Sequence, residues 1–140
     1  MPDLKKTSPC HCINIRRVAG HITDYYSRAI EPCGLTVNQF SVLWSLDFLG
    51  RSNTTTLAEQ VGLERSTLAR NLKPLLSRGF IEDTAPAGRR DRMFRVTPKG
   101  KMALEIGIPL WQAAQKEINA LIGPDKLTDF KAVLMRLQDI

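Results

Sequence analysis

A run of polar and basic side chains between residues 65 and 73 has the chemistry needed to bind nucleic acid. Guanidinium, ammonium, hydroxyl and carboxamide groups are the side-chain types that bond base edges and phosphates. The run consists of Arg65, Ser66, Thr67, Arg70, Asn71 and Lys73. A second set is spaced as on a helix and is apolar: Leu68, Leu72, Leu75 and Leu76. The polar residues are therefore expected on the outer face of a helix whose first turns can enter a major groove.

A second basic group lies in a short hairpin over residues 80–96, which we call the wing. Pro86 and Gly88 mark its turn, and extended segments flank the turn. The arginines of its tip are Arg89, Arg90 and Arg92. A flexible loop rich in guanidinium groups can enter a narrow minor groove, where the negative potential is enhanced. The wing is thus expected to contact DNA. The alternative is that it is only a solvated, charged hairpin.

Two short helices joined by a tight turn must position these groups. Apolar residues at helical spacing predict the first helix over about 57–61. Thr56 and Glu59 have the spacing of a capping box that would start it, and Gly62 is expected to end it. Pro74 lies inside the second helix, where it is expected to kink the helix or to separate its DNA-facing and core-facing halves.

The flanking segments are also predicted to be helical. We expect helices over about 12–30, 36–50, 98–122 with an interruption at Pro109, and 125–138. The apolar face of the last helix consists of Leu127, Phe130, Val133, Leu134 and Leu137. These terminal helices carry more apolar surface than a small winged domain needs, which predicts a homodimer.

The expected fold class is therefore mainly α with a small β-hairpin wing. A winged helix-turn-helix over about 36–97 would be flanked by helical dimerisation regions at about 10–35 and 98–140, and residues 1–140 would form a single domain. The net charge of +6 favours a polyanionic partner, and much of the excess lies between Arg65 and Arg95. No apolar run reaches membrane-spanning length, and Met1 to Pro9 lacks the apolar core of a signal peptide. We expect a cytoplasmic protein with no membrane partner.

Three segments carry a resemblance to the MarR family of bacterial and archaeal transcription regulators. They are LTVNQFSVLWSL at Leu35–Leu46, LAEQVGLERSTLARNLKPLLSRGFIE at Leu57–Glu82 and RVTPKG at Arg95–Gly100. The order of helices also matches across nearly the whole chain. The resemblance implies an obligate homodimer whose first and last helices interlock, and a winged helix-turn-helix bound to a palindromic operator, usually as a repressor.

Individual positions follow from the same resemblance. Ser66, Thr67 and Arg70 match recognition-helix contacts, and Arg90 falls where the family usually places its wing-tip arginine. The wing acid that commonly precedes that arginine by two residues is replaced here by Gly88, and Asp91 follows the arginine instead. The resemblance therefore does not predict the wing's internal salt bridge.

The cysteines offer a second kind of chemistry. Cys10 and Cys12 come at the start of the first expected helix, and Cys33 lies in the loop after it. A helix N-terminus stabilises a thiolate, the form that oxidants attack. By position, Cys12 and Tyr26 match the reactive cysteine and one tyrosine partner of the peroxide-sensing branch of the MarR family. Redox sensing through Cys12 and Cys10 is one hypothesis, and reduced cysteines without a signalling role are the alternative.

The match to the sensing branch is partial, because Arg16 and Val37 stand where it has two further tyrosines. A metal site is another alternative, built from Cys10–Cys12 with Cys33 or His21. However, Cys-x-Cys is tighter than the usual spacing of zinc ligands, and there is no second cysteine pair. We expect no metal and no other cofactor.

A small-molecule effector is a further hypothesis. The resemblance implies a ligand crevice between the dimer helices and the winged domain. The residues expected to line it are Arg17, Tyr25, Tyr26, Phe40, Trp44 and Trp111. Aromatic residues at helical spacing also simply fill a core, and that alternative stays open.

An enzyme is the competing class. The sequence has no Gly-rich phosphate loop, nucleophile elbow or clustered acid pair, and its two histidines both lie near the start. We therefore expect a homodimeric regulator that binds a palindromic operator in double-stranded DNA and represses until a small molecule or oxidant relieves it. An architectural DNA-binding protein with weak sequence preference is the alternative. A protein–protein adaptor is a third interpretation, which the wing arginines argue against.

Overall fold

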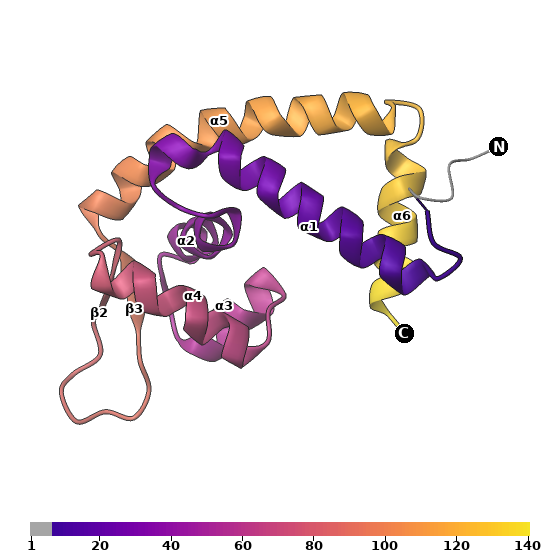
Figure 1. Ribbon diagram of the computed structural model, residues 1–140. Coiled ribbons are helices and arrows are strands. Elements are labelled where there is room, and N and C mark those ends of the chain that lie inside the picture. Colours follow the sequence, from indigo (N-terminus) through magenta and orange to yellow (C-terminus); the bar gives the residue numbers. More distant parts are fainter. Residues whose placement is uncertain (1–6) are drawn as a thin grey trace.

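The computed structural model describes residues 7–140. Residues 1–6 lie outside the described residues. They belong to the segment Met1 to Pro9, which we expect not to be a signal peptide. The elements are α1 (His11–Ala29), the 3-10 helix η1 (Glu31–Cys33), α2 (Val37–Leu49), β1 (Arg51–Ser52), α3 (Thr54–Val61), α4 (Arg65–Ser77), β2 (Ile81–Asp83), β3 (Phe94–Val96), α5 (Pro98–Ile122) and α6 (Leu127–Gln138). In Figure 1, α5 runs along one side with α1, while α2, α3, α4 and the sheet gather below. The mainly α fold with a small β wing is confirmed.

Helix α2 begins with a capping box and ends at a glycine, within the predicted range of about 36–50. The Thr36 hydroxyl accepts the Gln39 N–H at 3.2 Å, and the Gln39 carboxamide accepts the Thr36 N–H at 3.1 Å. This reciprocal capping box satisfies two backbone donors that a helix start otherwise leaves free. The helix ends at Gly50, whose φ of 79° suits a residue without a side chain.

The predicted start of the helix-turn-helix is wrong by a few residues. Helix α3 begins at Thr54, and the Asn53 carboxamide accepts the Thr56 N–H at 2.8 Å. Asn53 is therefore the N-cap, and Thr56 lies inside the first turn rather than before it. The Thr56–Glu59 spacing imitated a capping box because residues three apart also lie together on a continuing helix. Gly62 ends α3 with φ of 69°, as predicted.

Neither internal proline divides its helix. Helix α5 continues through Pro109, so the predicted interruption there is wrong. Proline removes one N–H donor, and packing of the remaining turns can keep the helix in one piece. In α4 the carbonyl of Pro74 still accepts the Arg78 N–H at 3.0 Å, and the helix extends to Ser77. Gly79, with φ of 78°, then turns the chain into β2.

One apolar core lies between α2, α3, α4, α5 and the sheet. Its fully buried members include Ile30, Phe40, Val42, Leu43, Leu46, Leu57, Leu68 and Leu75. The three strands are antiparallel in the order β1–β3–β2. Leu76, which we had placed with the apolar face of α4, is 39% exposed. The core thus supports one face of α4 and the base of the wing.

The terminal helices bury much less. Helix α6 has no buried residue, and its apolar face remains about two-fifths exposed at Phe130, Val133, Leu134 and Leu137. On α1, Ile15 and Val18 are more than half exposed. No helix of residues 7–140 combines the length and apolar character needed to cross a membrane.

Candidate nucleic-acid interface

The outer face of α4 presents the predicted polar run to solvent. Arg65, Ser66, Arg70 and Lys73 are exposed, and Thr67 and Asn71 are half-buried. On the opposite face, Leu68, Leu72 and Leu75 pack into the core. We refer to α4 as the recognition helix. Packing on one side fixes the direction in which its polar side points.

Two side chains of this face are ordered by contacts within α4. The Asn71 carboxamide donates to the Thr67 carbonyl at 2.9 Å, and the Arg70 guanidinium donates to the Thr67 hydroxyl at 3.3 Å. These contacts restrain Arg70 and Asn71 while leaving further donors and acceptors on both. Less side-chain entropy is then lost when they bind.

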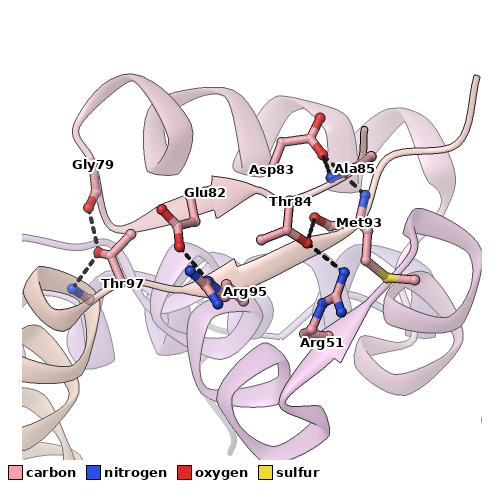
Figure 2. Close-up of polar contacts among 10 residues, drawn as sticks. Arg51, Gly79, Glu82, Asp83, Thr84, Ala85, Met93, Arg95 and Thr97 are labelled. Carbon is pink, nitrogen blue, oxygen red and sulfur yellow. Dashed lines mark hydrogen bonds and ion pairs between the residues drawn. The ribbon is translucent and has the colours of Figure 1, made fainter. Parts of the chain in front are cut away.

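Polar contacts hold the base of the wing (Figure 2). Glu82 and Arg95 face each other across β2 and β3 and form an ion pair. The Thr84 hydroxyl donates to the Met93 carbonyl at 3.0 Å and accepts from Arg51 at 2.9 Å, which ties the wing to β1. These bonds join three strands at the point where the loop of residues 84–93 begins.

Asp83 adds a second set of contacts at the same place. Its carboxylate accepts the N–H groups of Ala85 at 2.9 Å and Met93 at 3.3 Å and pairs with Arg92 at 2.8 Å. The hydrogen bond from the Ala85 N–H lowers the pKa of the Asp83 carboxyl, and the Arg92 guanidinium lowers it further. Asp83 therefore stays ionised and keeps its partners.

The wing does contain an internal salt bridge, but its acid comes from β2. Asp83 pairs with Arg92, whereas within residues 7–140 no ion pair involves Asp91. The second nitrogen of the Arg92 guanidinium donates to the Arg89 carbonyl at 2.6 Å. Of the three predicted wing arginines, Arg92 is thus bound within the wing. Arg89 and Arg90 make no side-chain hydrogen bond to the described residues.

The wing tip and the start of the recognition helix meet at one polar cavity. The cavity has a volume of about 390 Å³, and its lining consists of Asn53, Thr54, Thr55, Arg65, Arg90, Asp91 and Arg92. Arg65 also donates to the Thr55 hydroxyl. Guanidinium groups from two elements therefore converge beside the start of α3, where backbone N–H groups favour an anion. Asn53, Thr54 and Thr55 were missed as site residues, although the Asn-Thr-Thr run before an apolar helix was a visible signal.

A separate apolar cavity of about 470 Å³ gathers part of the predicted effector pocket. Its lining consists of Val37, Phe40, Ser41, Trp44, Ser45, Phe48, Gln60 and Trp111. Phe40, Trp44 and Trp111 form a stack, with ring centroids 5.3 Å and 5.2 Å apart. Tyr25 instead lines another cavity, with Arg28 and Glu117. Arg17 is exposed on α1 and lines neither.

The cysteines are spread along α1. Cys10 and Cys12 are exposed at its start, and Cys33 is buried beyond its other end. From Cys12 to the end of α1 is roughly 25 Å, because a helix rises about 1.5 Å per residue. Within one chain the metal alternative with Cys33 is therefore wrong, and no group of three metal-binding side chains lies together in residues 7–140. Burial raises the pKa of Cys33, which keeps its thiol protonated.

Tyr26 is not brought to Cys12 within one chain. It is buried, roughly 20 Å along α1 from Cys12. Its hydroxyl donates to the Gln115 carboxamide on α5, and burial raises its pKa. A Cys12–Tyr26 contact would therefore require a second chain.

A profile of the MarR family matches residues 35–87, from before α2 to the wing loop. The structure is similar to that of the transcriptional regulator MosR from M. tuberculosis in complex with DNA, with a TM-score of 0.78. The two sequences are 34% identical over 93% of this chain and 97% of the MosR chain. No curated protein sequence matches the chain.

Two more distant structures share the fold. A mutant of MarR from E. coli, complexed with operator DNA, has a TM-score of 0.77 and 21% identity and covers 88% of this chain and 89% of its own. BpsR from Bordetella bronchiseptica has a TM-score of 0.84 and 19% identity, covering 95% of this chain and 96% of its own. The BpsR structure concerns regulation of DNA binding by 6-hydroxynicotinic acid.

Proposed function

The chain belongs to the MarR family of transcription regulators, and we propose that it binds a palindromic operator in double-stranded DNA as a homodimer and represses transcription. The observation that carries this proposal is the convergence of Arg65 on α4 and Arg90 in the wing at one polar cavity. A DNA strand passing from a major groove to the next minor groove would meet both groups. The DNA complexes of MosR and E. coli MarR support the same partner.

The roles of the residues follow from their positions. Ser66, Thr67, Arg70 and Asn71 would read bases or adjacent phosphates from the recognition helix. Arg65 and Lys73 flank them and would bind the DNA backbone. In the wing, Arg89 and Arg90 would reach the minor groove or its phosphates, with Arg92 beside them. Transcription regulators of this kind are not generally enzymes. A cytoplasmic location stays a prediction.

The homodimer is supported by the terminal helices. Helix α6 keeps its apolar face about two-fifths exposed from Phe130 to Leu137. A twofold-related copy can bury such a face against itself, because a dimer of this symmetry uses the same patch twice. It would also present two recognition helices to two half-sites of a palindrome.

For the signal, a small molecule in the apolar cavity is supported best. Aromatic rings from α2 and α5 meet there beside Ser41, Ser45 and Gln60. A ligand in this cavity could change how α2, which packs against the recognition helix, sits relative to α5. Such a change would alter operator affinity if the ligand prefers one arrangement. The alternative is an oxidant acting at Cys12, and the exposure of Cys10 and Cys12 favours it.

The proposal is tested by titrating purified protein onto a duplex from its own upstream DNA and onto a scrambled duplex of equal length. We expect tighter binding to the upstream duplex and a footprint of two half-sites. Equal affinity for both duplexes would instead favour the architectural alternative.

The signal is tested by repeating the titration after mild hydroperoxide treatment, with Cys12→Ser as control. Loss of binding in the wild type alone, restored by a thiol reductant, would support the redox alternative. Unchanged binding in both proteins would leave the small-molecule proposal, and ligands of the aromatic cavity would be screened next.

A further inference from the structure

The carboxylate of Asp83 binds both arms of the wing loop at its base. One oxygen accepts the N–H of Ala85 on the outgoing arm at 2.9 Å and the N–H of Met93 on the returning arm at 3.3 Å (Figure 2). The other oxygen pairs with Nη1 of Arg92 at 2.8 Å. One side chain therefore bridges the two arms of the loop with three contacts, beside the bonds from the Thr84 N–H and hydroxyl to the Met93 carbonyl.

Arg92 carries this restraint to the tip of the loop. Its Nη2 donates to the carbonyl of Arg89 at 2.6 Å, and the Arg89 N–H donates to the Pro86 carbonyl at 3.2 Å. Arg90 follows directly in the chain and lines the polar cavity that Arg65 also lines. The contacts thus run from Asp83 through Arg92 to the backbone beside Arg90.

We propose that Asp83 is a positioning residue: it holds the wing loop so that Arg90 is presented to DNA, and Asp83 itself does not touch DNA. This inference rests on the proposed DNA-binding function. None of residues 84–93 is buried and residues 86–92 are exposed, so no residue of the loop is part of the apolar core. A loop that is free before binding loses conformational entropy when DNA orders it, and a loop already fixed avoids that loss. Two residues before Arg90, where the family resemblance implies an acid, this chain has Gly88, which has no carboxylate. The carboxylate that pairs with a wing arginine comes from Asp83 in β2 instead.

The sign of the effect separates positioning from simple charge. A carboxylate close to DNA repels phosphates, so on charge alone its removal should strengthen binding. Positioning predicts the opposite for Asp83. Asp91 provides the contrasting carboxylate, because it lies in the same loop, carries the same charge and forms no ion pair within residues 7–140. It lines the same polar cavity as Arg90, so its removal shows the effect of charge without the restraint.

The experiment measures operator affinity for the full-length wild type, Asp83→Ala, Asp83→Asn and Asp91→Ala. We expect Asp83→Ala to bind about five- to tenfold more weakly than the wild type. Asp91→Ala should bind at least as tightly as the wild type. Asp83→Asn keeps an oxygen that can accept hydrogen bonds from the Ala85 and Met93 N–H groups. It should therefore lose less operator affinity than Asp83→Ala. If Asp83→Ala matches the wild type or binds more tightly, the inference is overturned.

A double substitution tests whether Asp83 acts through Arg90. In an Arg90→Ala background, Asp83→Ala should cause no further loss, because the contact that it positions is already absent. An undiminished loss would show that Asp83 acts elsewhere and would also overturn the inference. If the wild type itself fails to bind its upstream DNA, the proposed function fails as well. That outcome is recognised before any variant is compared.

A measurement without DNA distinguishes positioning from loss of folding. Hydrogen exchange of the free protein should speed up at Ala85 and Met93 in Asp83→Ala, because their N–H groups lose their acceptor. Exchange of the α4 amides should not change, and Asp91→Ala should leave both regions as in the wild type. Unchanged exchange at Ala85 and Met93 would contradict the restraint on which the inference depends.

Discussion

The recognition helix and the wing are held in place by different interactions. Behind α4, Leu68 and Leu75 are fully buried, and apolar packing fixes the whole helix. The wing loop of residues 84–93 has no buried residue and is held by Asp83, Thr84 and Arg92 through polar contacts. Packing of this kind changes little with salt, whereas exposed ion pairs are screened by it.

This difference separates two tasks within one proposed interface. Reading a base needs donors held at fixed positions, which a packed helix provides. Following a groove needs an arm that holds its charges out from the body of the protein. The four predictions below test this contrast, beginning with the largest expected effect.

The largest effect is expected behind the recognition helix. Leu68→Ala should lower the free energy of unfolding by roughly 2–5 kcal/mol, because it leaves a cavity in a packed core. Urea denaturation measures it. Leu76→Ala on the same helix is the control. Leu76 is 39% exposed, so its substitution should lower the free energy of unfolding much less. Equal losses at the two positions would contradict the one-sided packing of α4.

On the outer face of the same helix, Arg70→Ala should weaken operator binding by roughly 1–3 kcal/mol and blur sequence choice. Affinity for the operator and for its single-base variants is the measurement. If all sequences weaken equally, Arg70 binds the DNA backbone instead.

In the wing, Arg90→Ala should reduce the salt dependence of binding by about one unit of slope, for specific and unspecific DNA alike. Titrations at several salt concentrations give the slope. Lys116→Ala, at an exposed position in the second half of α5, removes the same charge and should leave the slope as in the wild type. An unchanged slope for Arg90→Ala would show that this arginine does not contact phosphate.

The smallest effect is expected at the base of the wing. Glu82→Gln breaks the ion pair with Arg95. Both side chains of this pair are about half exposed. Such pairs contribute about 0.2–1 kcal/mol, and salt should erase most of the difference. Thermal unfolding at low and high salt checks this. A loss that persists at high salt would mean that Glu82 has another role.

Local signals predicted most of the fold. Spaced leucines indicated α4, and Gly62 ends α3 at the position expected from its backbone preference. Where two local signals competed, the sequence did not decide between them. Asn53 caps α3 rather than Thr56, because the chain leaving β1 already places Asn53 outside the helix.

The site was predicted less completely than the fold, for a physical reason. The sequence indicated which faces carry arginines, but not that Arg65 and Arg90 line the same cavity, which depends on where the wing tip lies relative to the starts of α3 and α4. The role of Asp83 could not be predicted either. Ala85 is two residues away along the chain, but Arg92 and Met93 reach Asp83 only when β2 and β3 pair.

The burial of Cys33 makes this thiol a reporter of local opening. Its side chain is 6% exposed, and a Cβ added at Gly107 of α5 would lie 3.3 Å from the Cys33 Cβ. A thiol reagent can reach Cys33 only when η1 and α5 separate, so its labelling rate follows the rate and extent of that separation. Cys10 and Cys12, by contrast, are exposed in the single chain without any opening of the core. A single alkylation time course should therefore contain a fast phase from Cys10 and Cys12 and a slow phase from Cys33. The rate of the slow phase reports how often the core opens at η1 and α5.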